Sequence, residues 1–193
     1  MKEQLIDNLI ACEWDMFGQV TNAGSRASCQ DDFDTFRIMR GSQFATWPED
    51  ALHSYLEDLQ TAQAEGRNLL TEKYARMMAS THPFEYQQIQ DQLHVIDDET
   101  EKMIEEIVAV NVSWQRDVDQ KYYELRRKGR PLTSEADNWH TTSFETYLRG
   151  ELQTYSSKTI AMYHAYTVQC QKEGRNLAEE NLAHIARAYG KTL

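Results

Sequence analysis

The sequence predicts an all-α fold, a single domain made of two duplicated four-helix units. A heptapeptide, QAEGRNL at residues 63–69, returns as QKEGRNL at residues 171–177. Long stretches without Pro or Gly are rich in Glu, Gln, Leu, Ala and Met, which is typical of helices. The 193 residues and the 40% hydrophobic content suffice for one sizeable core. We therefore expect one repeat at about residues 1–96 and another at about 97–193, related by a pseudo-two-fold axis.

Each copy of the heptapeptide has the composition of a corner between two helices. Gly66 and Gly174 favour the left-handed conformation that ends a helix. Asn68 and Asn176 favour capping of the next helix, because their side-chain oxygens accept backbone N–H groups. This chemistry explains the Gly and the Asn but not the Arg between them. A good corner without any duplication remains the alternative interpretation.

The spacing of the apolar residues predicts four helices in each repeat. In the first repeat we expect them at about residues 2–20, 35–44 and 49–65, with a fourth between Asn68 and Pro83. We expect their counterparts at about residues 101–118 and 143–155, then around Tyr163 and after Asn176. The segment from Pro83 to Glu99 is predicted to be a linker with a short helix.

Glu13 interrupts the apolar stripe of the first expected helix. When the first helices of the two repeats are aligned, Glu13 falls opposite Asn111, so a polar group interrupts both stripes at the same place. Burying an unpaired carboxylate is costly, so a buried Glu13 needs a partner, a proton or a wet pocket. A paired structural glutamate at the edge of the stripe is the alternative.

The connection before the second helix is dense in reactive side chains: Arg26, Cys29, Asp31 and Asp32. Either aspartate can cap the following helix. As a pair, the two carboxylates can instead hold a cation or share a proton. Cys29 near a helix N-terminus can have a lowered pKa, although a buried inert thiol is the commoner outcome.

The second helix places Arg40 and Gln43 on one face with two aromatic residues, Phe36 and Trp47. Such a face suggests a polar pocket in a mostly apolar wall. An exposed arginine whose stem packs on the aromatics is the alternative. At the offset of the heptapeptide, Gln43 corresponds to Glu151. Arg149 is out of register with Arg40 by one residue, so the two arginines need not be equivalent.

The composition of the chain disfavours several classes of function. The formal net charge of -11 disfavours nucleic-acid binding, which needs a basic face. The N-terminus does not have the pattern of a signal peptide, and no apolar run has membrane-spanning length. Three widely spaced cysteines are typical of reduced cytosolic thiols, so we expect a cytoplasmic protein. No phosphate loop, HExxH motif or nucleophile elbow occurs, so no cofactor is predicted and a divalent metal is left open.

Four sequence blocks carry a resemblance to a known family. They are RASCQDD at residues 26–32, IMRGSQ at residues 38–43, EKYARMM at residues 72–78 and SFETYLRGEL at residues 143–152. With these blocks, nearly the whole chain resembles DUF4125, a bacterial family of domains of unknown function. The resemblance implies no activity. It implies only that the four blocks are the signature of the family.

From these residues we expect a small-molecule enzyme of the lyase or hydrolase type, acting on a polar, amino-acid-like or carboxylate substrate in a pocket between the repeats. The expected catalytic residues, with a carboxylate as general acid or base, are Glu13, Cys29, Asp31 and Asp32. The expected substrate-binding residues, with arginines that pair with a carboxylate, are Arg26, Arg40, Gln43, Arg149 and Glu151. The alternative is a non-catalytic helical interaction or ligand-binding module. A homodimer fits either prediction.

Overall fold

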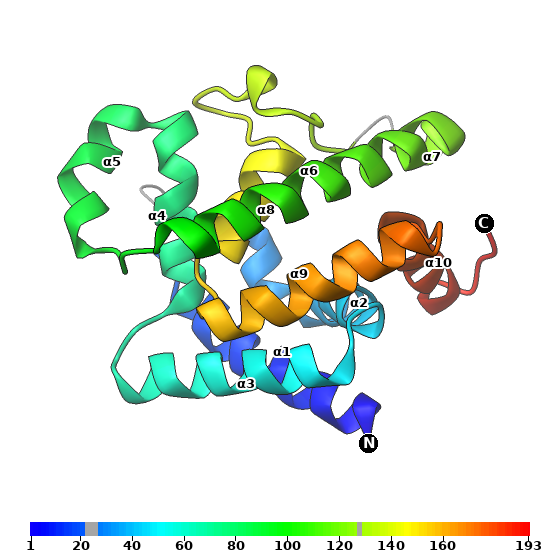
Figure 1. Cartoon of the computed structure of the whole chain (residues 1–193), viewed down its shortest axis with the longest axis horizontal. Helices are drawn as coiled ribbons and strands as arrows, with labels where there is room; N and C mark the ends of the chain where they lie inside the picture. The colour runs from blue at the N-terminus through cyan, green and yellow to red at the C-terminus, as the bar shows by residue number, and fades with distance from the viewer. Residues whose placement is uncertain (22–26, 127–128) are drawn as a thin grey trace. The chain divides into compact units, whose positions relative to one another are not determined.

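The computed structural model describes residues 1–21, 27–126 and 129–193 of the chain (Figure 1). Within these ranges every regular element is a helix, so the predicted all-α class is confirmed. None of the described helices combines the length and the apolar composition that crossing a lipid bilayer requires. The chain forms two compact units, which are described separately: unit 1 is Met1–Thr71 with Glu180–Leu193, and unit 2 is Glu72–Glu179.

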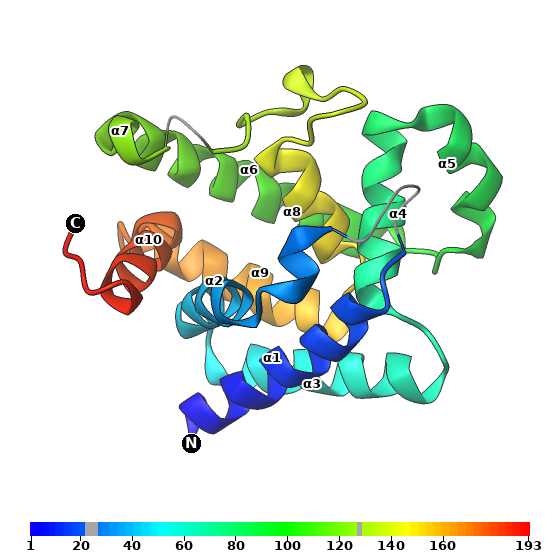
Figure 2. The ribbon, with the colours of Figure 1, turned by 180° about the vertical axis from the view of Figure 1, so that it is seen from behind.

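Unit 1 is built around the first three long helices of the chain. Its elements are α1 (Lys2–Gly18), the 3-10 helix η1 (Ser28–Asp31), α2 (Phe33–Ala45) and α3 (Glu49–Ala64), with the start of α4 (Leu69–Thr81) and most of α10 (Leu177–Ala188). Helix α1 packs against both α2 and α3, as the reverse view in Figure 2 shows. The core of the unit is apolar and aromatic, with Leu9, Phe44, Trp47, Leu52 and Leu59 almost fully buried.

Unit 2 is built around the longest helix, α6 (Asp98–Lys121), which packs against α8 (Phe144–Leu152) and runs beside α9 (Ser157–Lys172) (Figure 1). Its other elements are the remainder of α4, α5 (Pro83–Ile89), η2 (Gln90–Gln92), α7 (Tyr123–Arg126) and η3 (Ser134–Ala136). Ile104, Ile107, Leu152 and Ile160 are almost fully buried and form part of its core.

Side-chain caps explain why several helices begin where they do. Asp32, Asp97, Ser143 and Ser156 each accept the backbone N–H of the residue three positions later, at distances of 2.8 to 3.2 Å. Each bond satisfies one of the N–H groups that the first turn leaves unpaired. The starts of α2, α6, α8 and α9 are therefore encoded locally, and the predicted helix ranges are confirmed to within a few residues.

The two heptapeptides form corners with the same backbone conformation. Gly66 has a φ angle of 72° and Gly174 one of 70°, both in the left-handed region. The backbone N–H of Arg67 donates to the carbonyl of Ala62, and that of Arg175 donates to the carbonyl of Cys170. These bonds close the ends of α3 and α9 in the manner of a Schellman motif.

The asparagines of the two corners also make matching contacts. The side chain of Asn68 donates to the carbonyl of Met16 at 2.8 Å, and that of Asn176 donates to the carbonyl of Trp114 at 3.1 Å. Each Asn also accepts the N–H three residues on and so caps the next helix. Asn68 thus ties its corner to α1, and Asn176 ties its corner to α6.

The compact units differ in extent from the expected repeats. Residues 72–96, expected in the first repeat, belong to unit 2. Residues 180–193, expected in the second repeat, belong to unit 1. Most of α4 therefore belongs to unit 2, and most of α10 to unit 1.

Candidate functional site

A buried ion pair lies in the core of unit 1, between α1 and α2. The Nε of Arg40 donates to Oε2 of Glu13 at 2.6 Å, and its Nη2 donates to Oε1. The hydroxyl of Tyr55, on α3, donates to the same Oε1 at 2.7 Å. Arg40 also donates from Nη1 to the side chain of Gln43 at 2.6 Å. The structure therefore brings three of the expected site residues, Glu13, Arg40 and Gln43, into one cluster.

This cluster explains how the carboxylate of Glu13 is accommodated in the apolar stripe of α1. The side chain of Glu13 is only 2% exposed and that of Arg40 is 12% exposed. The guanidinium of Arg40 also lies over the ring of Phe44, 4.6 Å from its centroid. A bidentate pair with a further donor is the geometry in which a buried carboxylate can remain charged. Of the earlier alternatives, the structure favours the paired glutamate and excludes an exposed Arg40.

A second buried ion pair lies in unit 2, between α4 and α8. The ammonium of Lys73 donates to Oε2 of Glu151, and the hydroxyl of Tyr155 donates to Oε1 at 2.8 Å. Lys73 also lies 3.5 Å from the centroid of the Tyr147 ring. Burial, with a smaller contribution from the Glu151 carboxylate, raises the pKa of nearby Tyr163 above its ordinary range.

The reactive side chains before α2 lie at the surface of unit 1. Cys29, Asp31 and Asp32 are all exposed. The backbone N–H of Thr35 lowers the pKa of Asp32, which caps α2. Among the residues that the structure describes, no three His, Cys, Asp or Glu side chains gather as a metal site would require. Arg26, the remaining expected residue of this segment, lies outside the described residues.

Arg149 stands apart from the Lys73–Glu151 pair. Its Nε and Nη2 donate to the two carboxylate oxygens of Glu105 at 2.6 and 2.9 Å, and Nη2 also donates to Glu145 at 2.9 Å. The hydrogen bond to Glu105 raises the pKa of Arg149 further above its ordinary value. Arg40 and Arg149 therefore bind different groups, in agreement with their mismatch in register.

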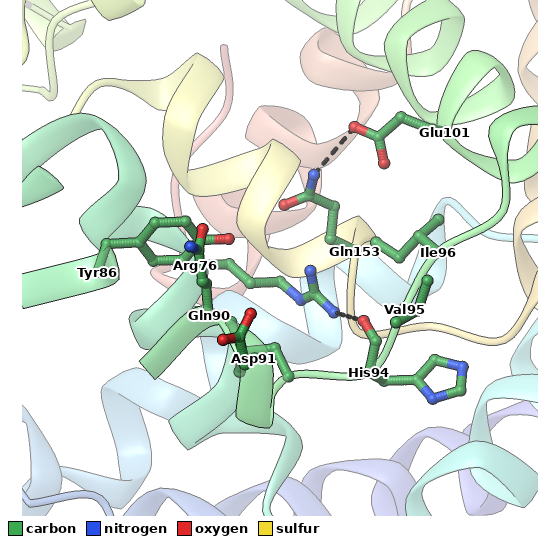
Figure 3. A pocket seen from close by; sticks show the side chains of 10 residues that line it. Arg76, Tyr86, Gln90, Asp91, His94, Val95, Ile96, Glu101 and Gln153 are labelled. Atoms are coloured by element: carbon green, nitrogen blue, oxygen red, sulfur yellow. Dashed lines mark hydrogen bonds between the residues drawn. The ribbon is translucent and has the colours of Figure 1, made fainter. Parts of the chain in front are cut away.

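Two neighbouring cavities lie in unit 2. The first, here called the arginine cavity, has a volume of about 370 Å³ and is lined by Arg76, Ala79, Ser80, Tyr86, Ser134, Thr146, Arg149, Gly150 and Gln153. The second, here called the acidic cavity, has a volume of about 280 Å³ and is shown in Figure 3; it is lined by Arg76, Tyr86, Gln90, Asp91, Leu93, His94, Val95, Ile96, Glu101 and Gln153. The two cavities share Arg76, Tyr86 and Gln153, so they adjoin one another.

Arg76 is the central side chain of these cavities. It is 8% exposed, and its Nη2 donates to the carbonyl of His94 at 2.6 Å, which ties α4 to the segment before α6 (Figure 3). Gln153 donates to Oε1 of Glu101 at 3.0 Å and so ties α8 to the first turn of α6. The wall between the cavities is therefore held in place by hydrogen bonds that join α4 to the segment before α6 and the end of α8 to α6.

Gly150 allows the close approach of α8 to α4 that forms the arginine cavity. A Cβ atom at this position would lie 2.9 Å from Cγ of Met77 and 3.1 Å from the carbonyl oxygen of Lys73. Both distances are shorter than ordinary van der Waals contact, so a side chain here would force the helices apart. The glycine thus places Arg149, its neighbour in sequence, on the same cavity as Arg76.

The comparison with protein families identifies the chain. A family model described as protein of unknown function DUF4125 matches residues 3–192, nearly the whole length. The chain belongs to this family. No curated protein and no solved structure matches this DUF4125 chain.

The sequence blocks that carry the DUF4125 resemblance contribute to all of these features. The block at 38–43 supplies Arg40 and Gln43 of the unit 1 cluster. The blocks at 72–78 and 143–152 supply the Lys73–Glu151 pair and, with Arg76, Thr146, Arg149 and Gly150, much of the arginine cavity.

Several residues of this DUF4125 site are not among the site residues predicted from the sequence. Arg76 was not predicted as a site residue. Its position inside the block at residues 72–78 was the available signal. Lys73 lies in the same block. Tyr86 carried no signal because it lies inside the segment predicted to be a linker, and Glu101 carried none because it lies at the start of the helix expected after that linker.

Proposed function

We propose that this chain binds a small polar molecule in the arginine cavity of unit 2, through a carboxylate on that molecule. The observation that carries the proposal is the pair of arginines on this cavity. Arg76 is largely buried, and burial of a guanidinium is costly. Arg149 adds the Nη1 group of a second guanidinium, since its Nε and Nη2 already donate to Glu105 and Glu145, and no acidic side chain is among the described residues that line the cavity. A planar guanidinium matches a carboxylate, with which it forms two parallel hydrogen bonds.

The hydroxyl groups of the cavity indicate what else the ligand carries. Ser80 and Thr146 both donate their protons to Asp137, at 2.6 and 2.5 Å. Since those protons are committed, the two hydroxyl oxygens can only accept from a ligand. A ligand that donates hydrogen bonds, such as a hydroxy- or amino-carboxylate, therefore fits this wall better than a simple fatty acid.

The test is a titration of the full-length protein with small hydroxy- and amino-carboxylates. Calorimetry measures the binding, and thermal unfolding measures the stabilisation by the ligand. Ligand at a hundred times its dissociation constant should stabilise the protein by about 2.7 kcal/mol. Arg76→Lys keeps the charge but loses the planar fork, so we expect the affinity to fall by about tenfold.

Arg67→Lys is the matched control, because Arg67 lies outside both cavities, in unit 1. The affinity of the Arg67→Lys variant for the carboxylate should equal that of the wild type. A wild-type protein that binds none of these carboxylates, or a folded Arg76→Lys variant with unchanged affinity, would contradict the proposal.

The lyase or hydrolase reaction expected from the sequence stays a prediction, as do a cytoplasmic location and a homodimer. Binding is common to an enzyme and to a non-catalytic module. Following a bound carboxylate by NMR over hours distinguishes them, because an enzyme converts its ligand and a binding module returns it unchanged.

Internal duplication of the helices is a further part of this proposal. The matching corners at Gly66 and Gly174 support it. So do the two tyrosines at the heptapeptide offset: Tyr55 bonds Glu13, and Tyr163 bonds Asn111, the residue aligned with Glu13. In an experimental structure, α1, α2 and α3 should superpose as a set on α6, α8 and α9. Sets that differ in crossing angles or order would contradict the duplication.

A further inference from the structure

We infer that the ligand of the arginine cavity also carries a cationic amine, which lies in the acidic cavity. The inference rests on the proposed function and names the class of its ligand, a zwitterionic amino acid. The two cavities share a wall but differ in charge. Asp91 and Glu101 line the acidic cavity, whereas none of the described residues that line the arginine cavity carries a carboxylate. A molecule that spans both therefore meets arginines at one end and carboxylates at the other.

Glu101 is the best-placed group to receive the amine. Its side chain is half-buried, in the first turn of α6, where the positive end of the helix dipole favours a carboxylate. Its Oε1 accepts from Gln153, and Oε2 is the oxygen left for a ligand. Within the described part of the chain, Glu101 forms no ion pair. A cation on the ligand would supply the opposite charge.

The rest of the acidic cavity supplies the further acceptors that an ammonium needs. A primary ammonium donates three hydrogen bonds and accepts none. Besides Glu101, the cavity offers the side-chain oxygen of Gln153 and the carboxylate of Asp91, both labelled in Figure 3. Gln153 lines both cavities and is fixed by Glu101, so it defines how the two ends of a ligand are oriented.

The experiment compares ligands that differ only in the amine. The series runs from glycine to 6-aminohexanoate, and each member is paired with the plain carboxylate of the same chain length. Binding to the full-length wild type, Glu101→Gln and Glu99→Gln is measured by calorimetry. Glu101→Gln keeps the shape of the side chain and an oxygen for Gln153. Glu99→Gln removes an exposed carboxylate from the same helical turn and is the matched control.

At the chain length that spans the two cavities, the amine should strengthen binding by about tenfold in the wild type and in Glu99→Gln. This advantage should nearly disappear in Glu101→Gln. The plain carboxylate should bind the wild type and Glu101→Gln equally. Equal binding of amino and plain carboxylates to the wild type overturns the inference but leaves the carboxylate site standing. An advantage that persists in Glu101→Gln also overturns it, and binding of neither class overturns both proposals.

Discussion

Lys73→Met is expected to lower the free energy of unfolding by about 3 to 5 kcal/mol. The reason is the carboxylate that remains. The side chains of Lys73 and Glu151 are 8% and 5% exposed, so Glu151 would keep the hydrogen bond from Tyr155 but lose its opposite charge in a buried position. Methionine has nearly the length of lysine, so lost volume contributes little. The change in the free energy of unfolding is measured by urea unfolding, with circular dichroism as the signal.

Two further variants separate the ion pair from packing. In the double variant Lys73→Met with Glu151→Met, no charge is left buried, and the stability should return close to that of the wild type. Lys121→Met is the matched control, because Lys121 pairs with Glu179 at the surface, where ion pairs contribute little. If Lys73→Met proves no more harmful than Lys121→Met, the buried pair does not contribute as the geometry indicates.

The helices and corners were predictable because their signals are local. Asp32 and Ser143 precede their helices by one residue, and Gly66 and Gly174 end theirs. The need of Glu13 for a partner was also predictable, since a carboxylate on an apolar stripe implies burial and compensation. The spacing of apolar residues follows from helix geometry alone and requires no knowledge of how the helices pack.

The identity of the partners was not predictable, because it depends on packing between distant segments. Tyr55 reaches Glu13 from 42 positions along the chain, and Lys73 reaches Glu151 from 78. No periodic pattern in the sequence encodes either pairing.

The cavities are harder still to foresee, since the acidic cavity is lined largely by residues 86–96, a segment without a strong apolar pattern. Cys29 and Asp31 were expected to be catalytic residues of a pocket, yet both are exposed. Residues in a connection between helices lack a periodic apolar pattern, so the sequence does not indicate whether their side chains are buried or exposed.

Arg40→Met is expected to lower the free energy of unfolding by about 3 to 5 kcal/mol, because it leaves Glu13 in the core without its counter-ion. Glu13→Leu should lower it by less. The guanidinium of Arg40 is nearer to the surface, and it keeps the side chain of Gln43 as a partner. Both values come from urea unfolding, with Arg37→Met, an exposed arginine on the same helix, as the control that should change little.

The size of the Arg40→Met effect also decides between the two interpretations of Glu13. A structural glutamate in a dry core depends on its counter-ion, and the full loss follows from removing it. A catalytic acid or base in a wet pocket has water to replace Arg40, so the loss should be below about 1 kcal/mol. The bonds from Arg40 and Tyr55 to one carboxylate favour the first outcome. A small loss would instead return Glu13 to the chemistry expected from the sequence, and would direct the search for a reaction to unit 1.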